Sequence, residues 1–143
     1  MSLEANKKLA RRYFEEFLNQ GNLCIADELC HANVAYRSPV VSIDGADRLK
    51  RFFLMIRKAF PDLHYVVEDL VAEGDKVVSS FSSRGTCLGG FEGTPLSGRQ
   101  FSVPGVTILC MHDGRISEVR SFCDIYTQMQ QLHWMPPAAK NCA

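Results

Sequence analysis

The sequence has 143 residues, of which 46% are hydrophobic, and its 16 basic side chains balance its 16 acidic ones. A chain of this length can bury a hydrophobic core, so we expect a single domain over residues 1–143. Nucleic-acid-binding proteins usually carry a basic excess or a basic stripe, and this sequence carries neither. No apolar run approaches the ~20 residues that span a bilayer, and residues 1–6 lack the apolar region of a secretory signal. We therefore expect a cytoplasmic protein that binds neither nucleic acid nor membranes.

The first part of the chain shows helical periodicity. Apolar side chains recur at helical spacing in Leu3–Gln20 while charged ones fill the other face, which predicts an amphipathic helix. Gly21 follows it, as glycine commonly does just past a helix C-terminus. A second, short helix is predicted over residues 23–30, and Asn22 suits its N-cap position.

A short strand and a longer helix come next. Residues 33–37 predict the strand, and residues 45–59 carry the apolar stripe of a helix that Asp44 can cap. Pro61 prevents this helix from continuing, because proline lacks the backbone N–H and clashes with the preceding turn.

The second half of the chain is rich in Val, Ile, Phe and Tyr, which favours strands. Tight turns at Gly74-Asp75 and Asp113-Gly114 predict two hairpins, and the glycine-rich segment 85–99 between them predicts a mobile loop over a pocket entrance. A short helix over residues 125–132 follows the last strand. Helices followed by antiparallel strands predict an α+β fold with helices on one face of a curved sheet. The predicted strands span residues 63–73, 76–84, 100–111 and 115–123.

The six cysteines have the pattern of free, buried thiols. The sequence has no C-x-x-C pair, and its four histidines do not fall at zinc-binding spacing beside the cysteines. Without a signal peptide, a disulfide framework is not expected. The six are Cys24, Cys30, Cys87, Cys110, Cys123 and Cys142.

A set of short motifs extends over nearly the whole chain and is densest toward its end. They are Asn22 after the first helix, Phe60-Pro61-Asp62-Leu63, Gly85-Thr86, Gly93-Thr94-Pro95-Leu96-Ser97-Gly98-Arg99, Asp113-Gly114-Arg115-Ile116-Ser117-Glu118, Asp124 and Gln131-Leu132. Together these motifs resemble the SnoaL-like polyketide cyclase family, which belongs to the nuclear-transport-factor-2-like superfamily.

The resemblance implies a cone-shaped α+β barrel, in which a strongly curved, mostly antiparallel sheet wraps around N-terminal helices. It also implies a homodimer formed through the outer face of the sheet. Characterised cyclases of the family close a ring by intramolecular aldol condensation, without metal or cofactor. Their essential acid/base is an aspartate just after the last strand, and Asp124 stands at the matching position. Because one fold serves many functions, the resemblance implies the fold more firmly than the reaction.

Two roles are open for Asp124. Side chains alternate along a strand, so Ile116, Glu118, Arg120, Phe122 and Asp124 are predicted to share a partly inward face. Burial there would raise the pKa of the carboxyl group toward that of a useful base. Aspartate immediately before a helix is also a preferred N-cap, so Asp124 can serve the backbone instead.

Two positions depart from the family pattern. Arg120 stands where many members carry a bulky aromatic, and it could bind an anionic substrate group or pair with Glu118 or Asp124. Cys87 stands where histidine is frequent, and a buried thiol is a poorer proton donor than an imidazole.

Several further side chains are candidates for an apolar substrate pocket. The aromatic ones and Met55 are equally typical of a plain core, and His64 can face the interior or the solvent. With Arg120 and Phe122, the predicted pocket comprises Tyr13, Phe17, Tyr36, Met55, Phe60, His64 and Phe101. Its expected occupant is a small hydrophobic molecule.

Three functions follow from these observations. The first is a cofactor-independent acid/base enzyme, a cyclase or an isomerase, acting on a hydrophobic carbonyl compound. The second is epoxide hydration, for which Arg120, Asp124 and Asp62 would hold a water molecule. The third is a ligand-binding or dimerising module without catalysis, which the departures at Arg120 and Cys87 favour.

Overall fold

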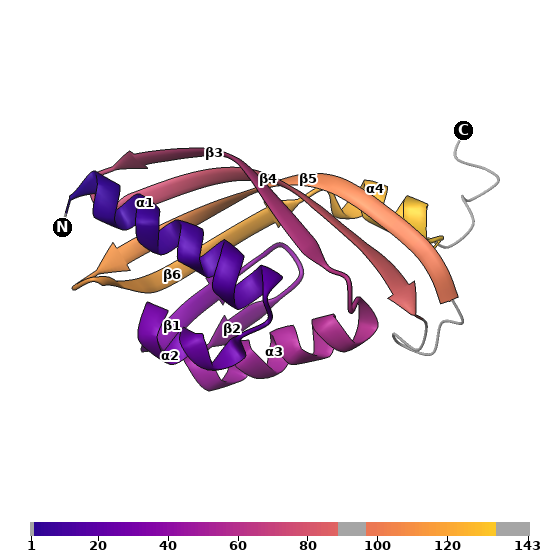
Figure 1. Cartoon of the computed structure of the whole chain (residues 1–143), viewed down its shortest axis with the longest axis horizontal. Coiled ribbons are helices and arrows are strands. Elements are labelled where there is room, and N and C mark those ends of the chain that lie inside the picture. The colour runs from indigo at the N-terminus through magenta and orange to yellow at the C-terminus, as the bar shows by residue number, and fades with distance from the viewer. Residues whose placement is uncertain (1, 89–96, 134–143) are drawn as a thin grey trace.

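The computed structural model describes residues 2–88 and 97–133. Short helical elements come first, long strands follow, and one helix ends the described chain (Figure 1). The helical elements are α1 (Leu3–Arg12), a π-helix (Tyr13–Asn19), a 3₁₀ turn (Leu23–Ile25), α2 (Ala26–Leu29), α3 (Ala46–Ala59) and α4 (Ile125–Leu132). The strands are β1 (Cys30–Arg37), β2 (Ser42–Asp44), β3 (His64–Glu73), β4 (Lys76–Leu88), β5 (Ser97–His112) and β6 (Arg115–Cys123).

The six strands form one curved sheet in the order β2-β1-β6-β5-β4-β3. All neighbouring pairs are antiparallel except β1 and β6, which run parallel. In Figure 1 the long strands arch over α1, α2 and α3, while α4 lies at the far end of the sheet. The predicted α+β fold with a strongly curved, mostly antiparallel sheet around N-terminal helices is therefore confirmed, although the sheet stays open.

The predicted first helix is divided in two. α1 begins at a Ser2 cap, whose side chain accepts a hydrogen bond of 3.0 Å from the backbone N–H of Ala5. From Tyr13 the chain winds as a π-helix, which keeps four large apolar side chains buried against the sheet. Gly21 then takes a left-handed φ of 71°, and the Arg57 guanidinium donates to the Leu18 carbonyl at 2.8 Å. A carbonyl group at the end of this helix thus receives a hydrogen bond from a side chain of α3.

Two predicted caps are wrong, and one strand was not predicted. Asn22 makes no side-chain hydrogen bond to the turn that follows it. Asp44 ends β2, where it pairs with Arg37 at 2.8 Å, and Gly45 takes the N-cap position of α3 instead. β2 escaped prediction because its three residues are too few to show an alternating pattern.

The two hairpins form where the turn residues predict them. Gly74, Asp113 and Gly114 all take positive φ values, which the tight reversals require. β4 and β5 extend further than predicted, so that residues 85–88 and 97–99 belong to the sheet. The rest of the predicted loop, residues 89–96, lies outside the described residues.

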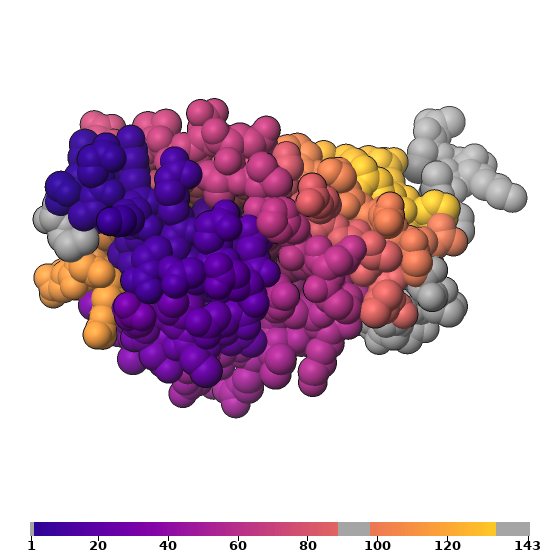
Figure 2. Space-filling model, in the orientation of Figure 1, coloured from indigo at the N-terminus to yellow at the C-terminus, as the bar shows by residue number. Residues whose placement is uncertain are grey.

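The core lies between the sheet and the N-terminal helices. Phe14 contacts both Tyr65 and Phe81 of the sheet, while Phe17 packs edge-to-face on Phe53 of α3. In Figure 2 the N-terminal residues, coloured indigo to violet, cover the left part of the face shown. A second, smaller cluster lies toward α4 and consists of Ala59, Phe60, Leu63, Cys87, Phe101, Val103 and Leu132.

Two further findings concern the described residues only. None of their helices is long and apolar enough to cross a membrane. Their five cysteines are all free, as the sequence predicted, but only Cys30 and Cys87 are fully buried, and Cys24 is exposed. Cys142 lies beyond the described residues.

Candidate functional site

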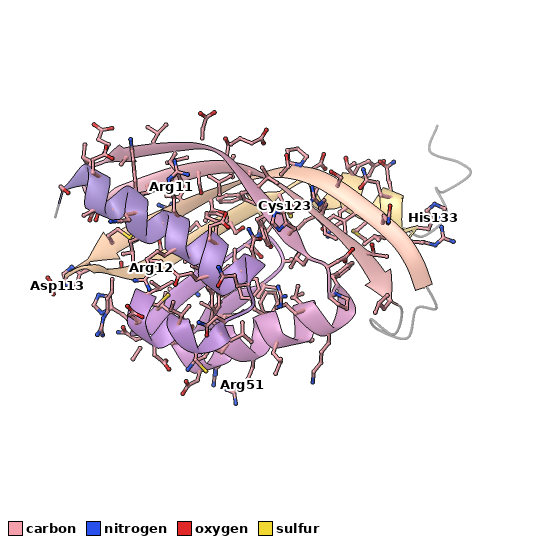
Figure 3. All side chains as sticks on the ribbon, viewed as in Figure 1. Arg11, Arg12, Arg51, Asp113, Cys123 and His133 are labelled. Atoms are coloured by element: carbon pink, nitrogen blue, oxygen red, sulfur yellow. The ribbon has the colours of Figure 1, made fainter. Side chains whose placement is uncertain are left out.

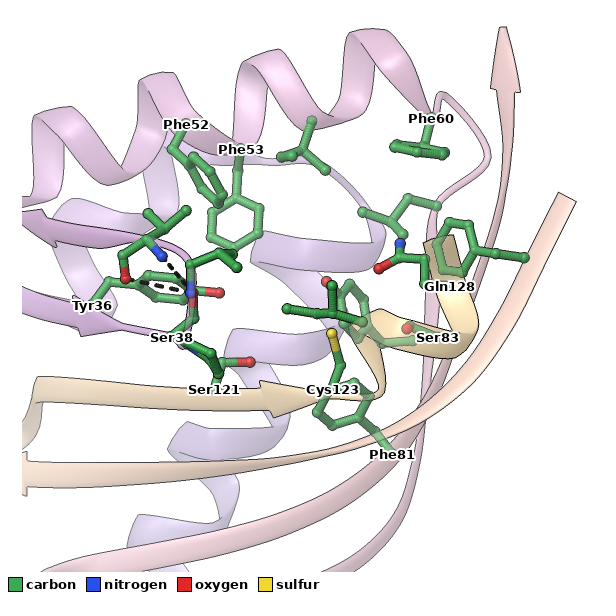
Figure 4. A pocket seen from close by; sticks show the side chains of 18 of the residues that line it. Tyr36, Ser38, Phe52, Phe53, Phe60, Phe81, Ser83, Ser121, Cys123 and Gln128 are labelled. Carbon is green, nitrogen blue, oxygen red and sulfur yellow. Dashed lines mark hydrogen bonds between the residues drawn. The ribbon is translucent and has the colours of Figure 1, made fainter. Parts of the chain in front are cut away.

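An apolar cavity of about 300 Å³ lies between α3, the inner face of the sheet and α4 (Figure 4). Its walls are aromatic and aliphatic, with a few hydroxyl, thiol and amide groups. Among the described side chains that line it, none is Asp, Glu, Lys, Arg or His. The lining residues are Tyr36, Ser38, Pro39, Val40, Val41, Phe52, Phe53, Ile56, Phe60, Leu63, Tyr65, Phe81, Ser83, Phe101, Ser121, Cys123, Ile125, Gln128 and Met129.

The structure brings three of the predicted pocket residues together around this cavity. Tyr36 comes from β1, and Phe60 and Phe101 form an edge-to-face pair with ring centroids 5.2 Å apart. Tyr13 and Phe17 are instead buried in the main core beneath the sheet. The cavity therefore lies toward the α4 end of the molecule, beyond the first helix.

Met55 and His64 do not line the cavity. Met55 is 48% exposed because it lies on the solvent side of α3, opposite Phe53. His64 begins β3, which is an edge strand, and its side chain is half-buried outside the cavity. Helical periodicity could not separate the two sides of α3 here, because apolar residues occur on both.

A β-bulge reverses the predicted orientation of the last strand. Met111 pairs with Ile116, but Cys110 pairs with Glu118, so β6 contains one extra residue at Ser117. Since alternation has a period of two, the extra residue exchanges the two faces from that point on. Ile116 is buried, and the inward residues after the bulge are Val119, Ser121 and Cys123.

Arg120 and Phe122 consequently face away from the cavity, which corrects their predicted orientation. Phe122 is 46% exposed, and Arg120 pairs with Glu118 at 3.1 Å. The side chains proposed to hold water for epoxide hydration are not assembled, because each has a different partner. Asp62 accepts hydrogen bonds from Thr86, and Asp124 accepts them from a residue of α4.

Asp124 is the N-cap of α4. Its carboxylate accepts a 3.0 Å bond from the backbone N–H of Thr127 and a 2.6 Å bond from the Thr127 hydroxyl. The hydroxyl bond and then the backbone bond hold the pKa of Asp124 below its usual value, against a smaller opposing effect of burial. The predicted rise in pKa is therefore wrong, since the side chain is exposed and bonded rather than buried and isolated.

Asp124 is nevertheless adjacent in sequence to residues of the cavity. Cys123 and Ile125, its two neighbours, both line the cavity, while Asp124 itself does not. Figure 3 places Cys123 well inside the outline of the molecule, whereas Asp113 and His133 lie at its two ends.

The titratable groups of the cavity are neutral at physiological pH. Burial raises the pKa of Tyr36 to about 12, and hydrogen bonding by Ser121 opposes part of that rise. Burial likewise raises the pKa of Tyr65 and of the Cys123 thiol, the latter with a contribution from Asp124. These side chains act in the cavity as hydrogen-bond donors and acceptors rather than as charges.

Cys87 is fully buried in the smaller cluster beside Phe101, as a structural thiol would be. No three side chains of the described ranges 2–88 and 97–133 gather as metal ligands would. Sequence reasoning missed Ser121, Cys123 and Gln128, because the bulge and the placement of α4 bring them to the cavity. An extra polar residue at Ser117 in an alternating strand was the one available signal.

Comparison with known proteins agrees with this architecture. The family model described as SnoaL-like polyketide cyclase matches residues 8–132. A proposed SnoaL-like polyketide cyclase from Jannaschia sp. CCS1 is similar in structure, with a TM-score of 0.84, 28% identity and coverage of 93% of this chain and 94% of that one. TsrD from Streptomyces laurentii gives a TM-score of 0.82 and 25% identity over 94% of this chain and 99% of that one.

IdmH from Streptomyces antibioticus, described as a proposed polyketide cyclase, gives a TM-score of 0.78. It is 25% identical, and the match covers 90% of this chain and 98% of that one. A search of curated proteins finds no match. The family model extends from α1 to the end of α4 and so includes every wall of the cavity. The chain therefore belongs to the SnoaL-like polyketide cyclase family.

Proposed function

We propose that the protein is a cofactor-independent acid/base enzyme that acts on a small, uncharged, hydrophobic carbonyl compound, either by intramolecular aldol cyclisation or by isomerisation. The observation that carries the proposal is the cavity, whose described walls offer aromatic surface and neutral hydrogen-bonding groups but no charge. A charged ligand would lose its hydration there without gaining a counter-ion, whereas a neutral carbonyl compound needs only one or two donors. Membership of a family named for cyclases supports the reaction class.

Asp124 is the proposed acid/base. Its lowered pKa keeps it a carboxylate at neutral pH, which is the form that removes a proton. It would take a proton from the carbon next to a carbonyl, and the C–H electrons would form an enolate. The enolate carbon would attack a second carbonyl of the same molecule, and the resulting alkoxide would recover the proton from Asp124.

The geometry sets two requirements on this reaction. The Asp124 side chain has to leave Thr127 and turn past Cys123 into the cavity. A carboxylate of low pKa is also a weak base, because proton transfer is efficient when the two pKa values are close. The substrate should therefore carry a relatively acidic C–H, such as one activated by two neighbouring unsaturated groups.

A binding module without catalysis is the second candidate. The exposure of Asp124 and its two bonds to Thr127 favour it, because these bonds give the carboxylate a complete structural role. The two candidates share a ligand class and differ only in whether Asp124 removes a proton.

The bicyclic ketone 2-tetralone tests the proposal, because one of its C–H positions lies between a carbonyl and an aromatic ring. We expect the protein to accelerate deuterium uptake at that position in D₂O, as measured by NMR. Asp124→Asn should abolish the acceleration and keep the affinity for 2-tetralone, since asparagine also caps helices well. Binding of 2-tetralone without any acceleration by the natural protein would support the binding module instead. Failure to bind would contradict both.

A further inference from the structure

A row of hydroxyl side chains crosses the inner face of the sheet. Ser79 of β4 pairs with Thr107 of β5, and Thr107 pairs with Ser121 of β6. The Ser79 hydroxyl donates to the Thr107 carbonyl at 3.4 Å, and the Thr107 and Ser121 hydroxyl oxygens are 3.5 Å apart. Ser79 and Thr107 are completely or almost completely buried. The inner face of this sheet is otherwise largely apolar, so the row is a distinct feature.

Burying hydroxyl groups costs free energy unless they are hydrogen-bonded, and apolar side chains would serve a core better at these positions. The neighbouring inward positions on β4 are Val77 and Phe81, which show that this layer accepts apolar residues. A row of three polar residues therefore indicates a role other than stability.

The row ends beside Tyr36. Ser121 and Tyr36 both line the cavity, and their strands, β6 and β1, are neighbours in the sheet. Burial raises the pKa of Tyr36 to about 12, so its hydroxyl group stays protonated and can donate a hydrogen bond. Figure 4 shows Tyr36 and Ser121 at the same end of the cavity, with the Tyr36 ring beside Phe52 and Phe53.

We propose that the Tyr36 hydroxyl donates a hydrogen bond to the carbonyl oxygen of the ligand, and that the row Ser79–Thr107–Ser121 orients it. This inference rests on the proposed function, because it assumes a carbonyl compound in the cavity. A donor fixed at this point stabilises the negative charge that develops on the oxygen during enolate formation, and it requires no rearrangement when the charge appears. Tyr36 is then a catalytic residue, and Ser121 and Thr107 are positioning residues.

The carbonyl stretching band of bound 2-tetralone gives a direct test, because a hydrogen bond to the carbonyl oxygen lowers its frequency. We expect a lower frequency in the natural protein than in Tyr36→Phe, measured by infrared difference spectroscopy with a ¹³C-labelled carbonyl. Tyr36→Phe should also bind 2-tetralone about tenfold more weakly, which corresponds to about 1.4 kcal/mol. The affinity for tetralin, which lacks the oxygen, should not change.

Tyr65→Phe is the matched control, since it removes the same atom from the other tyrosine of the cavity. It should leave the carbonyl band in place. Ser121→Ala should broaden the band and move it part of the way, and Ser121→Thr should restore it, which a purely structural role would not predict. All variants keep or closely mimic the buried volume, and their thermal unfolding checks that they fold.

Three results would overturn the inference. If 2-tetralone binds but its band is the same in the natural protein and Tyr36→Phe, the inference fails while the proposed ligand class stands. The same holds if Tyr65→Phe removes the shift. If neither 2-tetralone nor tetralin binds the natural protein, both the proposed function and this inference fail.

Discussion

At the scale of single residues, Asp124 shows how one carboxylate can meet two demands. Its bonds to Thr127 stabilise the first turn of α4, and the same bonds lower the pKa on which any proton transfer would depend. A residue that caps a helix at the edge of a cavity therefore has a structural role whether or not it has a catalytic one. The distinction becomes measurable because Asn and Ala differ as caps.

We predict that Asp124→Ala lowers the midpoint of thermal unfolding by several degrees, whereas Asp124→Asn lowers it clearly less. Alanine cannot accept the backbone N–H of Thr127, while asparagine can. Differential scanning fluorimetry at pH 7 measures the effect. Equal losses in both variants would contradict the capping role and would point to a charge effect instead.

The lowered pKa of Asp124 also predicts a pH dependence. A carboxylate whose pKa is lower in the folded state stabilises that state fully above its unfolded pKa of about 3.9, and this contribution disappears as the pH falls through the folded pKa. Stability should therefore decrease below about pH 4 in the natural protein and decrease less in Asp124→Asn. Urea unfolding at pH 7, 4 and 3 measures this difference. Asp62, whose pKa is lowered mainly by the Thr86 hydroxyl, provides the same background loss in both proteins.

At the scale of elements, the bulge in β6 decides which side chains reach the cavity. Ser117 is the extra residue, and its hydroxyl donates to the Cys110 carbonyl at 3.1 Å. If Ser117 were instead paired in a regular ladder, the strand from Glu118 onward would have to turn Arg120 inward and Ser121 outward, because the side-chain period is two.

We predict that deletion of Ser117 preserves cooperative folding, because it removes the extra residue and leaves the pairs Met111–Ile116 and Cys110–Glu118 intact, so every later side chain keeps its present face. Ser117→Ala should cost about 0.5–1.5 kcal/mol, the usual value of one hydrogen bond. Circular dichroism and urea unfolding of both variants test this prediction. A deletion variant without a cooperative transition would show that the bulge itself, and not the pairing on either side of it, holds the faces of β6 in place.

Gly105 in β5 is a second position at which a single residue decides how a strand packs. A Cβ there would lie 2.8 Å from the Phe122 carbonyl oxygen and would collide with the Phe81 ring, which lines the cavity. We predict that Gly105→Ala destabilises the protein by about 1–3 kcal/mol through overpacking. Phe81→Leu should recover part of this loss in the double variant, because the two sites are in contact. Val106→Ala, at the neighbouring outward position, is the control in chemical denaturation.

At the scale of the whole molecule, the described chain has a large core under the N-terminal helices and a smaller cluster around the cavity. α4 covers the part of β5 that extends beyond the end of β6. The Gln131 side chain there accepts a hydrogen bond from the backbone N–H of Ser102 and donates one to the Ser102 carbonyl. An amide side chain thus takes the place of a neighbouring strand and protects a sheet edge. Leu132, fully buried, anchors the helix in the smaller cluster.

We predict that Leu132→Ala costs about 2–5 kcal/mol and loosens α4 selectively. Hydrogen exchange should become faster in the amides of α4, while the central amides of β4 and β5 stay protected, because local opening occurs where few buried contacts hold an element. Mass spectrometry of peptides from both regions measures the rates. Gln130→Ala, an exposed position of the same helix, should change neither rate, and uniform acceleration by Leu132→Ala would show that the two clusters unfold together.

Local signals in the sequence predict most of the elements and the class of fold. Helical periodicity in Leu3–Gln20 and 45–59, turn residues at Gly74 and Gly114, and strand-forming segments between them are local signals, and each was read correctly within a few residues. They are readable because backbone propensity and amphipathic spacing act over short distances. The cap at Asp124 was also open to prediction for the same reason.

Which side chains meet depends on how distant segments pair in the folded chain. The extra residue at Ser117 exchanges the two faces of β6. Asp44 pairs with Arg37 of β1 and therefore does not cap α3. Tyr36 and Ser121 come from strands that are distant in sequence but parallel neighbours in the sheet, so no local pattern could join them. A cavity depends on the register of several strands at once, and register is a property of pairing rather than of any one segment.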